Sequence, residues 1–308
     1  MMRMEIQYDR HDEEWEKCIG DRKRGEIAAT WMQSGTLDRW RHNRMLGSIN
    51  PFITKTSTWL TVGDGRYGTD AHYIMSQNGT AHASDISDKL LKIGNQKGFI
   101  DSYSQQNAEE LSFEDNSFDY VLIKEALHHF PRPWLALYQA FRVCRKGVIL
   151  IEPNDDQTHL QQTISGCLIK LGGAIKRSTR RILGNASCRS HHYNFEPVGN
   201  FVYAINPKEL EKFLLGMHYT KIAFKGINDA YEEGIEFIQM NTQSTKERKT
   251  ISRVKSSIAE ADARCKAGKS SYSLLTAALF KCEPTDELRV RLVEQEWELK
   301  DLPKNPYL

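Results

Sequence analysis

The chain has 308 residues, of which 40% are hydrophobic and 27% charged, and its formal net charge is +2 at pH 7. This length is enough for one α/β domain with additions, and the small net charge argues against a nucleic-acid partner held by whole-surface attraction. Its six cysteines are scattered without a Cys-x-x-Cys pair, which argues against a disulfide framework or a zinc site. No apolar run has the length of a signal peptide or a membrane span, so we expect a cytoplasmic protein.

Residues 1–50 have a helical pattern and precede the predicted core. Apolar residues in this segment are spaced loosely like one face of a helix, namely Trp15, Ile19, Ile27, Trp31 and Leu37. We therefore expect an N-terminal helical cap over residues 1–50 and a main domain over residues 51–308. The pattern leaves open whether the cap closes over a bound ligand or only packs against the sheet.

The first predicted strand runs into a glycine-rich turn. Residues 59–68 have the sequence Trp-Leu-Thr-Val-Gly-Asp-Gly-Arg-Tyr-Gly, and a helical pattern follows. Glycines at such a junction let the backbone turn tightly and approach a ligand, toward which the N–H groups of the next helix point. The motif alone is weak evidence, because Gly-x-Gly-x-x-Gly also occurs by chance and in NAD and FAD sites.

A second strand is predicted at residues 79–84 and ends at Asp85, which lies 22 positions after Gly63. A carboxylate at this point can accept hydrogen bonds from both hydroxyls of a ribose. At this stage NAD and S-adenosylmethionine fit equally well.

The segment before the fourth strand separates these two cofactors. Residues 107–119 have the sequence Asn-Ala-Glu-Glu-Leu-Ser-Phe-Glu-Asp-Asn-Ser-Phe-Asp, and an apolar strand follows. Here the chain resembles the class I S-adenosylmethionine-dependent methyltransferases, in particular the broad type 11 group with Asp-Ala-Glu-x-Leu-Pro-Phe-x-Asp-x-Ser-Phe-Asp at this place. The resemblance covers roughly residues 55–155.

The resemblance implies a site for S-adenosyl-L-methionine. Gly63, Gly65 and Gly68 would surround its methionine part, and Asp85 would hold the ribose. The side chain of Asn107 and the backbone of Ala108 would meet the adenine edge. The stretch from Ile123 to Leu127, which includes Lys124 and Glu125, would line the inner face of the cofactor.

Three positions depart from the family's pattern. Thr61 stands where an acid is usual, two residues before the first glycine, and Asp64 within the loop becomes a candidate ligand for the cofactor's amino group or hydroxyls. Asn107 replaces an aspartate, and Ser112 replaces a proline. We interpret these changes as signs of a divergent subfamily.

The remaining pattern predicts a Rossmann-like α/β fold: a seven-stranded, mostly parallel sheet with helices on both faces. Strands are expected near residues 57–63, 79–84, 99–103, 117–123, 147–152, 219–225 and 273–282. The family's last two strands form an antiparallel pair. A charged helix and an irregular tail are expected over residues 284–308, and a solvated helical hairpin within an insertion at residues 230–272.

A second insertion, residues 154–205, is expected to form a helical lid. Between Gln157 and Phe195 it has no acidic residue but six basic ones. Elements after the fifth strand lie over the carboxyl ends of such a sheet, where ligands bind. A basic lid there predicts an anionic small-molecule or glycan substrate, such as a nucleotide sugar, an acidic glycan or a lipid-linked glycan at a membrane surface. The alternative is a basic helix that only solvates its outer face.

Removal of a proton from an acceptor hydroxyl calls for a base with a pKa near neutrality. Four histidines are candidates: His128 and His129 after the fourth strand, and His191 and His192 on the lid. Glu125 and Glu152 are candidates for orienting a histidine or a sugar hydroxyl. No carboxylate and histidine cluster has the spacing of a metal site, so we predict no metal.

The predicted function is O-methylation of a sugar, glycan or nucleotide-sugar hydroxyl, and the lid resembles that of methyltransferases associated with bacterial surface polysaccharides. The alternatives are methylation of an aromatic or quinone-like metabolite and a non-catalytic partner subunit that binds S-adenosylmethionine. RNA methylation and NAD-dependent oxidoreduction are disfavoured. The oligomeric state stays open.

Overall fold

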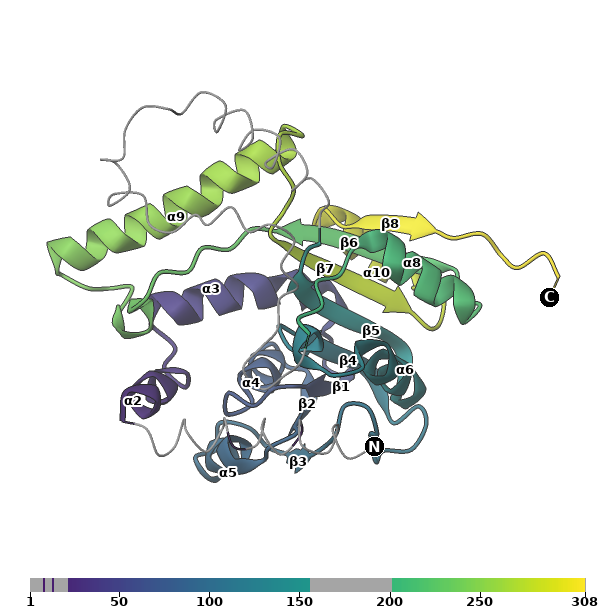
Figure 1. Ribbon diagram of the computed structural model, residues 1–308, viewed down its shortest axis with the longest axis horizontal. Coiled ribbons are helices and arrows are strands. Elements are labelled where there is room, and N and C mark those ends of the chain that lie inside the picture. The colour runs from purple at the N-terminus through teal and green to yellow at the C-terminus, as the bar shows by residue number, and fades with distance from the viewer. Residues whose placement is uncertain (1–7, 9–12, 14–21, 156–200, 308) are drawn as a thin grey trace, which may run out of the picture.

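A computed structural model describes residues 8, 13, 22–155 and 201–307 of the chain. The predicted lid lies almost wholly outside these residues, as do His191 and His192. Eight strands form one sheet within the described residues (Figure 1). The strands are β1 Thr58–Val62, β2 Thr80–Asp85, β3 Tyr103–Gln105, β4 Phe118–Lys124, β5 Cys144–Pro153, β6 Lys221–Ile227, β7 Leu274–Phe280 and β8 Glu298–Asp301.

The sheet has the order β3-β2-β1-β4-β5-β7-β6-β8. The pairs among β3, β2, β1, β4 and β5 are parallel, whereas β7 is antiparallel to both β5 and β6. The predicted Rossmann-like class and the antiparallel pair of β6 and β7 are therefore confirmed. The topology also brings the carboxyl ends of the parallel strands to one edge of the sheet, where such folds bind ligands.

Helices cover both faces of the sheet. They are α2 Arg22–Thr30, α3 Leu37–Leu46, α4 Thr69–Ser76, α5 Lys89–Gln96, α6 Pro133–Val143, α8 Pro207–Gly216, α9 Thr245–Lys266 and α10 Asp286–Glu294, with short 3₁₀ turns η1 Gly47–Phe52, η2 Leu127–His129 and η3 Ile235–Phe237. Alternate residues of β4 show the two layers. Tyr120 and Leu122 pack with α4 and α10, and Val121 and Ile123 pack with α6 and α8.

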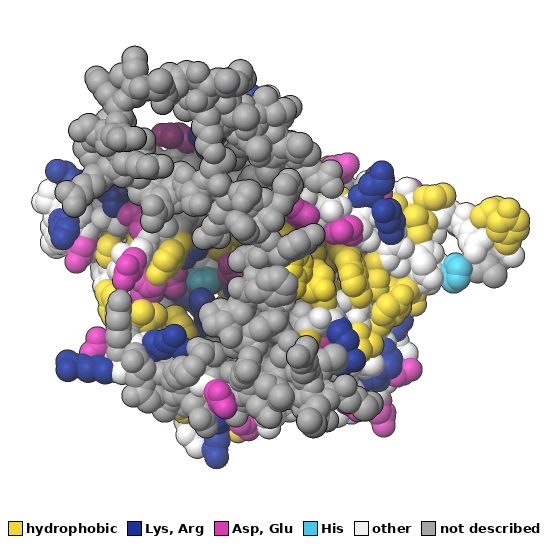
Figure 2. Space-filling model, in the orientation of Figure 1, with side chains coloured by type: hydrophobic (Ala, Val, Ile, Leu, Met, Phe, Trp, Pro, Cys, Tyr) yellow, Lys and Arg dark blue, Asp and Glu magenta, His cyan; other side chains and the backbone are white. Residues whose placement is uncertain are grey.

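The layer of α6 and α8 also carries apolar side chains at the surface. Figure 2 shows hydrophobic groups gathered over these two helices, and Tyr138 and Leu215 are 49% and 36% exposed. Behind them the ring of Phe213 lies 4.9 Å from that of Tyr138 and 5.7 Å from that of Phe141. Aromatic packing thus continues from the core to this surface.

The sheet has one strand more than predicted, because the tail expected to be irregular contributes β8. Its sequence, Glu-Leu-Lys-Asp, has no apolar alternation, and none of its residues is buried. It pairs antiparallel with β6, and Lys221 Nζ lies 2.6 Å from Asp301 Oδ1. A charged edge strand gives almost no hydrophobic signal in a sequence.

The insertion at residues 230–272 differs from the predicted solvated hairpin. It contains η3 and one long helix, α9, which runs next to α3 (Figure 1). Ile251, Val254 and Ile258 of α9 pack against Leu37 of α3 in a separate apolar cluster. The insertion therefore supports the N-terminal cap as a packing layer.

Candidate active site

A cavity of about 670 Å³ opens at the carboxyl ends of β1, β2, β4 and β5. Its volume is in the range of small-molecule sites. Nine of the predicted site residues line it, namely Gly63, Asp64, Asp85, Asn107, Ala108, Lys124, Glu125, His128 and His129. Gly65 and Gly68 lie in the same loop but outside the lining.

The glycine loop brings the end of β1 against the end of β4. Gly63 has φ +79°, and a Cβ atom at this position would lie 2.4 Å from Cβ of Ala126. Gly68 has φ +77° and precedes α4, and a Cβ there would lie 2.7 Å from Ile100 Cγ2. Both positions therefore require glycine for conformation and for space.

Asp64 holds this loop together. Its buried carboxylate accepts hydrogen bonds from Thr61 Oγ1 at 2.8 Å, Asp70 N at 3.1 Å and Ala71 N at 2.9 Å. Burial raises the pKa of this carboxyl, and the neighbouring Asp70 adds to the effect. The structure thus gives Asp64 the role of holding the loop, three residues after Thr61, the position where an acid is expected. Contact of Asp64 with a cofactor stays a prediction.

The residues predicted for the nucleoside follow β2 and β3. Asp85 is the last residue of β2 and lines the cavity. Its Oδ1 accepts a hydrogen bond from Ser87 N at 3.0 Å. Asn107 follows β3, and its Oδ1 accepts from Glu109 N at 2.9 Å. Because the ends of β3, β2 and β1 are neighbours in the sheet, Asn107, Asp85 and Gly63 suit successive parts of one extended ligand.

Lys124 and Glu125 close the floor of the cavity at the end of β4. Nζ of the buried Lys124 lies 3.4 Å from Asp70 Oδ1 and 3.4 Å from Glu125 Oε2. Burial acts to lower the pKa of Lys124, but Asp70 and Glu125 outweigh it and raise this pKa. Glu125 has φ +48°, a strained value for a residue with a side chain.

His128 is paired with a buried carboxylate. Its Nδ1 lies 2.6 Å from Oε2 of Glu152, which is the next-to-last residue of β5 and is fully buried. Oε1 of Glu152 accepts hydrogen bonds from the backbone N–H groups of Ala126 and Leu127, at 2.9 and 2.8 Å. One carboxylate therefore fixes both the turn η2 and the imidazole ring. His129 also lines the cavity, with its ring 3.9 Å from that of His128.

The N-terminal cap contributes Tyr8, Arg24 and Trp31 to the cavity wall. The Tyr8 hydroxyl donates to Glu109 Oε2 at 2.6 Å, and the backbone N–H of Arg132 donates to Glu109 Oε1 at 2.6 Å. The cap thus reaches the ligand cavity in addition to packing on the sheet. These residues were not predicted as site residues, because no local pattern connects Tyr8 with Glu109.

Within the described residues, no group of three or more His, Cys, Asp or Glu side chains is placed to hold a metal ion. Within the same residues, no helix combines the length and the apolar character needed to cross a membrane.

Part of the chain is similar to known proteins. Residues 60–151 match a family model described as a methyltransferase domain. A curated relative from Rhizobium rhizogenes, described as ubiquinone/menaquinone biosynthesis C-methyltransferase UbiE, is 32% identical over 133 residues, covering 41% of this chain and 51% of the relative. The protein with the same description from Brucella suis is 34% identical over 134 residues, which cover 41% and 49%. The chain spans about half the length of these relatives.

Two solved structures resemble the chain at low sequence identity. One is a S-adenosylmethionine-dependent methyltransferase from Methanosarcina mazei, with a TM-score of 0.45 and 15% identity, covering 77% of this chain and 97% of that one. The other is magnesium protoporphyrin IX methyltransferase from Synechocystis with bound S-adenosylhomocysteine, with a TM-score of 0.43 and 13% identity, covering 78% and 84%.

Proposed function

We propose that this chain, whose residues 60–151 match a methyltransferase domain model, uses S-adenosylmethionine to methylate an acceptor and removes a proton from one of the acceptor's hydroxyl groups. The observation that carries this proposal is the pairing of His128, which lines the cavity, with the buried carboxylate of Glu152. Histidine is a suitable base at neutral pH, and the buried carboxylate sets its orientation.

The cavity has the groups that S-adenosylmethionine needs. Asn107 and Ala108 would meet the adenine, Asp85 the ribose hydroxyls and the loop at Gly63 the methionine part, and no side chain at Gly63 obstructs this approach. When bound, the cofactor supplies an electrophilic methyl group. The protein's own task is then to position the acceptor and to take up its proton.

Glu152 determines which nitrogen of His128 acts as the base. Because Nδ1 faces the carboxylate at 2.6 Å, Nδ1 carries the ring proton and donates a hydrogen bond to Oε2. The free lone pair of the ring is therefore on Nε2. Nε2 accepts the hydroxyl proton as the acceptor oxygen takes the methyl group. The carboxylate stabilises the imidazolium that forms, and the proton passes to solvent after the product leaves.

The first candidate acceptor is the hydroxyl of a sugar, glycan or nucleotide sugar, as in bacterial surface-polysaccharide synthesis. Arg24 and Arg66 in the cavity wall support it, because guanidinium groups bind phosphate and carboxylate well. A lipid-linked glycan would also require contact with a membrane surface. In this proposal the protein acts in the cytoplasm, without nucleic acid.

The second candidate is ring methylation of a hydroquinone. Two observations favour it: the names of the curated relatives, and the apolar part of the wall at Trp31, Phe130 and Pro131. A base would serve here as well, since removing a phenolic proton raises the electron density on the ring carbon that takes the methyl group. That carbon then loses its hydrogen as a proton, and the phenolic oxygen is protonated again, so one proton is released in total.

An acceptor panel tests the proposal. The protein is incubated with S-adenosylmethionine and either a set of uridine-diphosphate sugars or a set of 1,4-hydroquinones, and S-adenosylhomocysteine and methylated product are measured by mass spectrometry. Methylation of one class supports the proposal and selects the acceptor. Binding of S-adenosylhomocysteine without transfer to either class would instead favour a non-catalytic subunit.

A further inference from the structure

We infer that the outer face of helix α9 is a binding surface for the anionic headgroups of a phospholipid membrane. This surface lies outside the ligand cavity, to whose wall α9 contributes no residue. Membrane binding goes beyond the proposed methyl transfer, and it can be measured without an acceptor or a cofactor.

The segment that forms α9 has a large excess of positive charge. Residues 245–269 contain eight Lys and Arg but only three Asp and Glu, a net charge of +5, whereas the whole chain carries +2. The rest of the chain is therefore negative in total, and positive charge is concentrated on this helix and the turn after it. All eight basic residues are exposed, namely Lys246, Arg248, Lys249, Arg253, Lys255, Arg264, Lys266 and Lys269.

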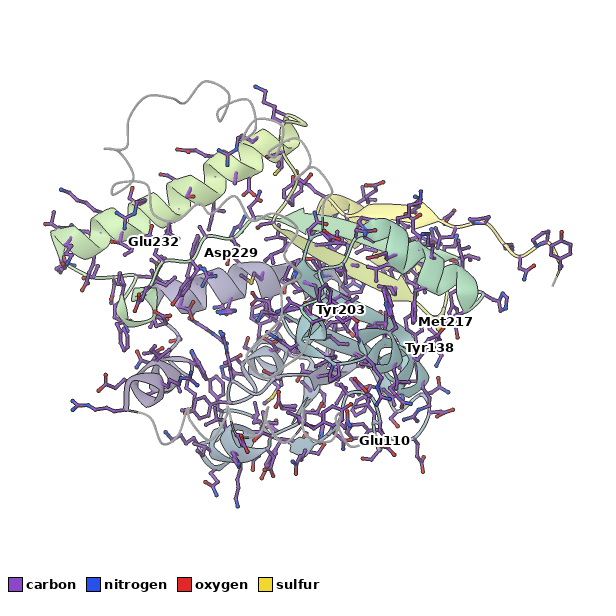
Figure 3. The ribbon with its side chains drawn as sticks, in the orientation of Figure 1. Glu110, Tyr138, Tyr203, Met217, Asp229 and Glu232 are labelled. Carbon is purple, nitrogen blue, oxygen red and sulfur yellow. The ribbon has the colours of Figure 1, made fainter. Side chains whose placement is uncertain are left out.

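Most of these cations have no acidic partner. Arg253 pairs with Glu232, which is labelled in Figure 3, and its Nε lies 2.7 Å from Oε1 of that residue. Lys266 Nζ lies 3.1 Å from Oε1 of Glu296. The other six form no ion pair with a carboxylate in the described part of the chain. Their charges are therefore available to an external partner.

The three acids of the segment offset this charge only weakly. Oδ2 of Asp262 lies 2.8 Å from Nη2 of Arg44 in α3, so its charge is already neutralised next to the cap. Glu247 lies in the first turn of α9 and accepts a hydrogen bond from Oγ1 of Thr242. Of the three acids, only Glu260 is classed as exposed. The outer face therefore presents a surplus of cations to the solvent.

The helix forms a convex ridge at the periphery of the molecule (Figure 1). It has 22 residues, which corresponds to a length of about 33 Å. Its apolar residues Ile251, Val254 and Ile258 pack inward against the cap. Ser256 and Ala263 lie on the opposite side of the helix and are exposed, with basic residues on both flanks. A long convex array of cations suits a flat anionic surface better than it suits one small anion.

The composition of α9 favours a membrane over a nucleic acid. The helix has no aromatic side chain that could stack on a base. Its apolar residues are used in packing, so membrane binding would depend on charge and not on insertion into the lipid. Clusters of Lys and Arg bind anionic headgroups in this way, and the attraction is screened by salt. A lipid-linked acceptor could then be held in the same membrane.

Co-sedimentation with vesicles tests the inference. The full chain is mixed with vesicles of phosphatidylcholine alone, or of phosphatidylcholine and phosphatidylglycerol in equal amounts. We expect binding only to the anionic vesicles. The affinity should fall about tenfold or more as the ionic strength rises from about 0.01 to 0.15 M, because the Debye length shortens from about 30 to 8 Å.

Two double variants locate the surface. Lys249→Gln with Arg264→Gln should weaken binding to the anionic vesicles by about 25-fold, roughly fivefold for each charge removed. Gln has a helix propensity close to that of Lys and Arg, so α9 should stay folded. The matched control is Lys92→Gln with Lys97→Gln, which removes the same charge from exposed positions in and directly after α5. The control should change the affinity by less than about twofold, since these charges lie far from α9 (Figure 1).

Three results would contradict this role of α9. The first is a wild type that does not bind the anionic vesicles at low salt, which requires no variant. The second is an equal affinity of the two double variants, because net charge or another segment would then explain the binding. The third is binding of duplex or single-stranded RNA in a gel-shift assay without binding of vesicles, which would assign the surface to a nucleic acid. The affinity for S-adenosylhomocysteine should be the same in all three proteins, so its loss would concern the proposed function and not α9.

Discussion

Nδ1 of His128 and Oε2 of Glu152 lie 2.6 Å apart, at the ends of the neighbouring parallel strands β4 and β5. The same carboxylate accepts the N–H groups of Ala126 and Leu127 through Oε1. The backbone of the turn and the ring of the proposed base therefore share one support, and a change in Glu152 has consequences for both.

Glu152→Gln should lower turnover by about 10²–10³-fold, because an amide neither fixes the Nδ1–H tautomer nor stabilises an imidazolium. The affinity for S-adenosylhomocysteine should stay within about threefold of wild type. Steady-state kinetics with the acceptor found in the panel, together with calorimetry, measure the two effects. Normal turnover in this variant would show that Glu152 supports only the turn.

Gly63→Ala should abolish measurable binding of S-adenosylhomocysteine. The added methyl group would lie 2.4 Å from Ala126 Cβ and would displace the end of β4. Gly98→Ala is the control, since Gly98 also has positive φ, at +67°, but has open space around it. It should cost only about 1–2 kcal/mol of stability and leave binding intact. Equal binding by the two variants would contradict this account of the glycine loop.

Arg41→Ala should reduce the free energy of unfolding by about 3–5 kcal/mol, as expected when a buried ion pair loses one partner. Arg41 Nη1 lies 2.6 Å from Asp38 Oδ1, and its Nη2 contacts Asp229, which follows β6 (Figure 3). Urea unfolding measures the loss. In Arg253→Ala, which removes a solvent-exposed pair with Glu232, the change should be at most about 1 kcal/mol. Similar losses in both variants would mean that the buried contact does not anchor the cap.

Acid should destabilise the protein through His42. Burial lowers the pKa of His42 well below 6.5, and nearby Lys124, Arg66, Arg41 and Arg39 lower it further. Below pH 6.5 the unfolded chain binds a proton that the folded chain does not, until the pH reaches the lowered pKa. The free energy of unfolding therefore falls as the pH drops in this window, by up to about 1.4 kcal/mol per pH unit.

Urea unfolding at pH 7.5, 6.5 and 5.5 measures this slope in the wild type and in His42→Gln. The other histidines are present in both proteins, so the difference between the two slopes isolates His42. The variant should be flatter below pH 6.5. Identical slopes would show that His42 takes up its proton as readily in the folded protein as in the unfolded chain.

Features that depend on one strand and the turn after it could be predicted from the sequence. The apolar run of β1, the predicted second strand and the glycine spacing located Gly63 and Asp85, because each signal is local and each residue lies at a strand end. The predicted carboxylate orienting a histidine is present as Glu152 beside His128. The sequence did not single out this pair, since it depends on how β4 and β5 are placed side by side.

Features that depend on distant contacts could not be predicted. Tyr8 and Glu109 are 101 positions apart, and their hydrogen bond forms only because the fold brings Tyr8 next to the segment after β3. The loop-holding role of Asp64 depends on the backbone path into α4. β8 can be recognised only from its pairing with β6, because three of its four residues are charged and exposed.

Replacement of His128 tests whether this histidine removes the proton of the acceptor. Turnover of His128→Ala with the identified acceptor is compared with the affinity of the same variant for S-adenosylhomocysteine, with His129→Ala as the neighbouring control. We expect a loss of about 10²–10⁴-fold in kcat for His128→Ala, with unchanged affinity, and a much smaller loss in kcat for His129→Ala. Near-normal turnover in His128→Ala would contradict the claim that this histidine removes the proton of the acceptor.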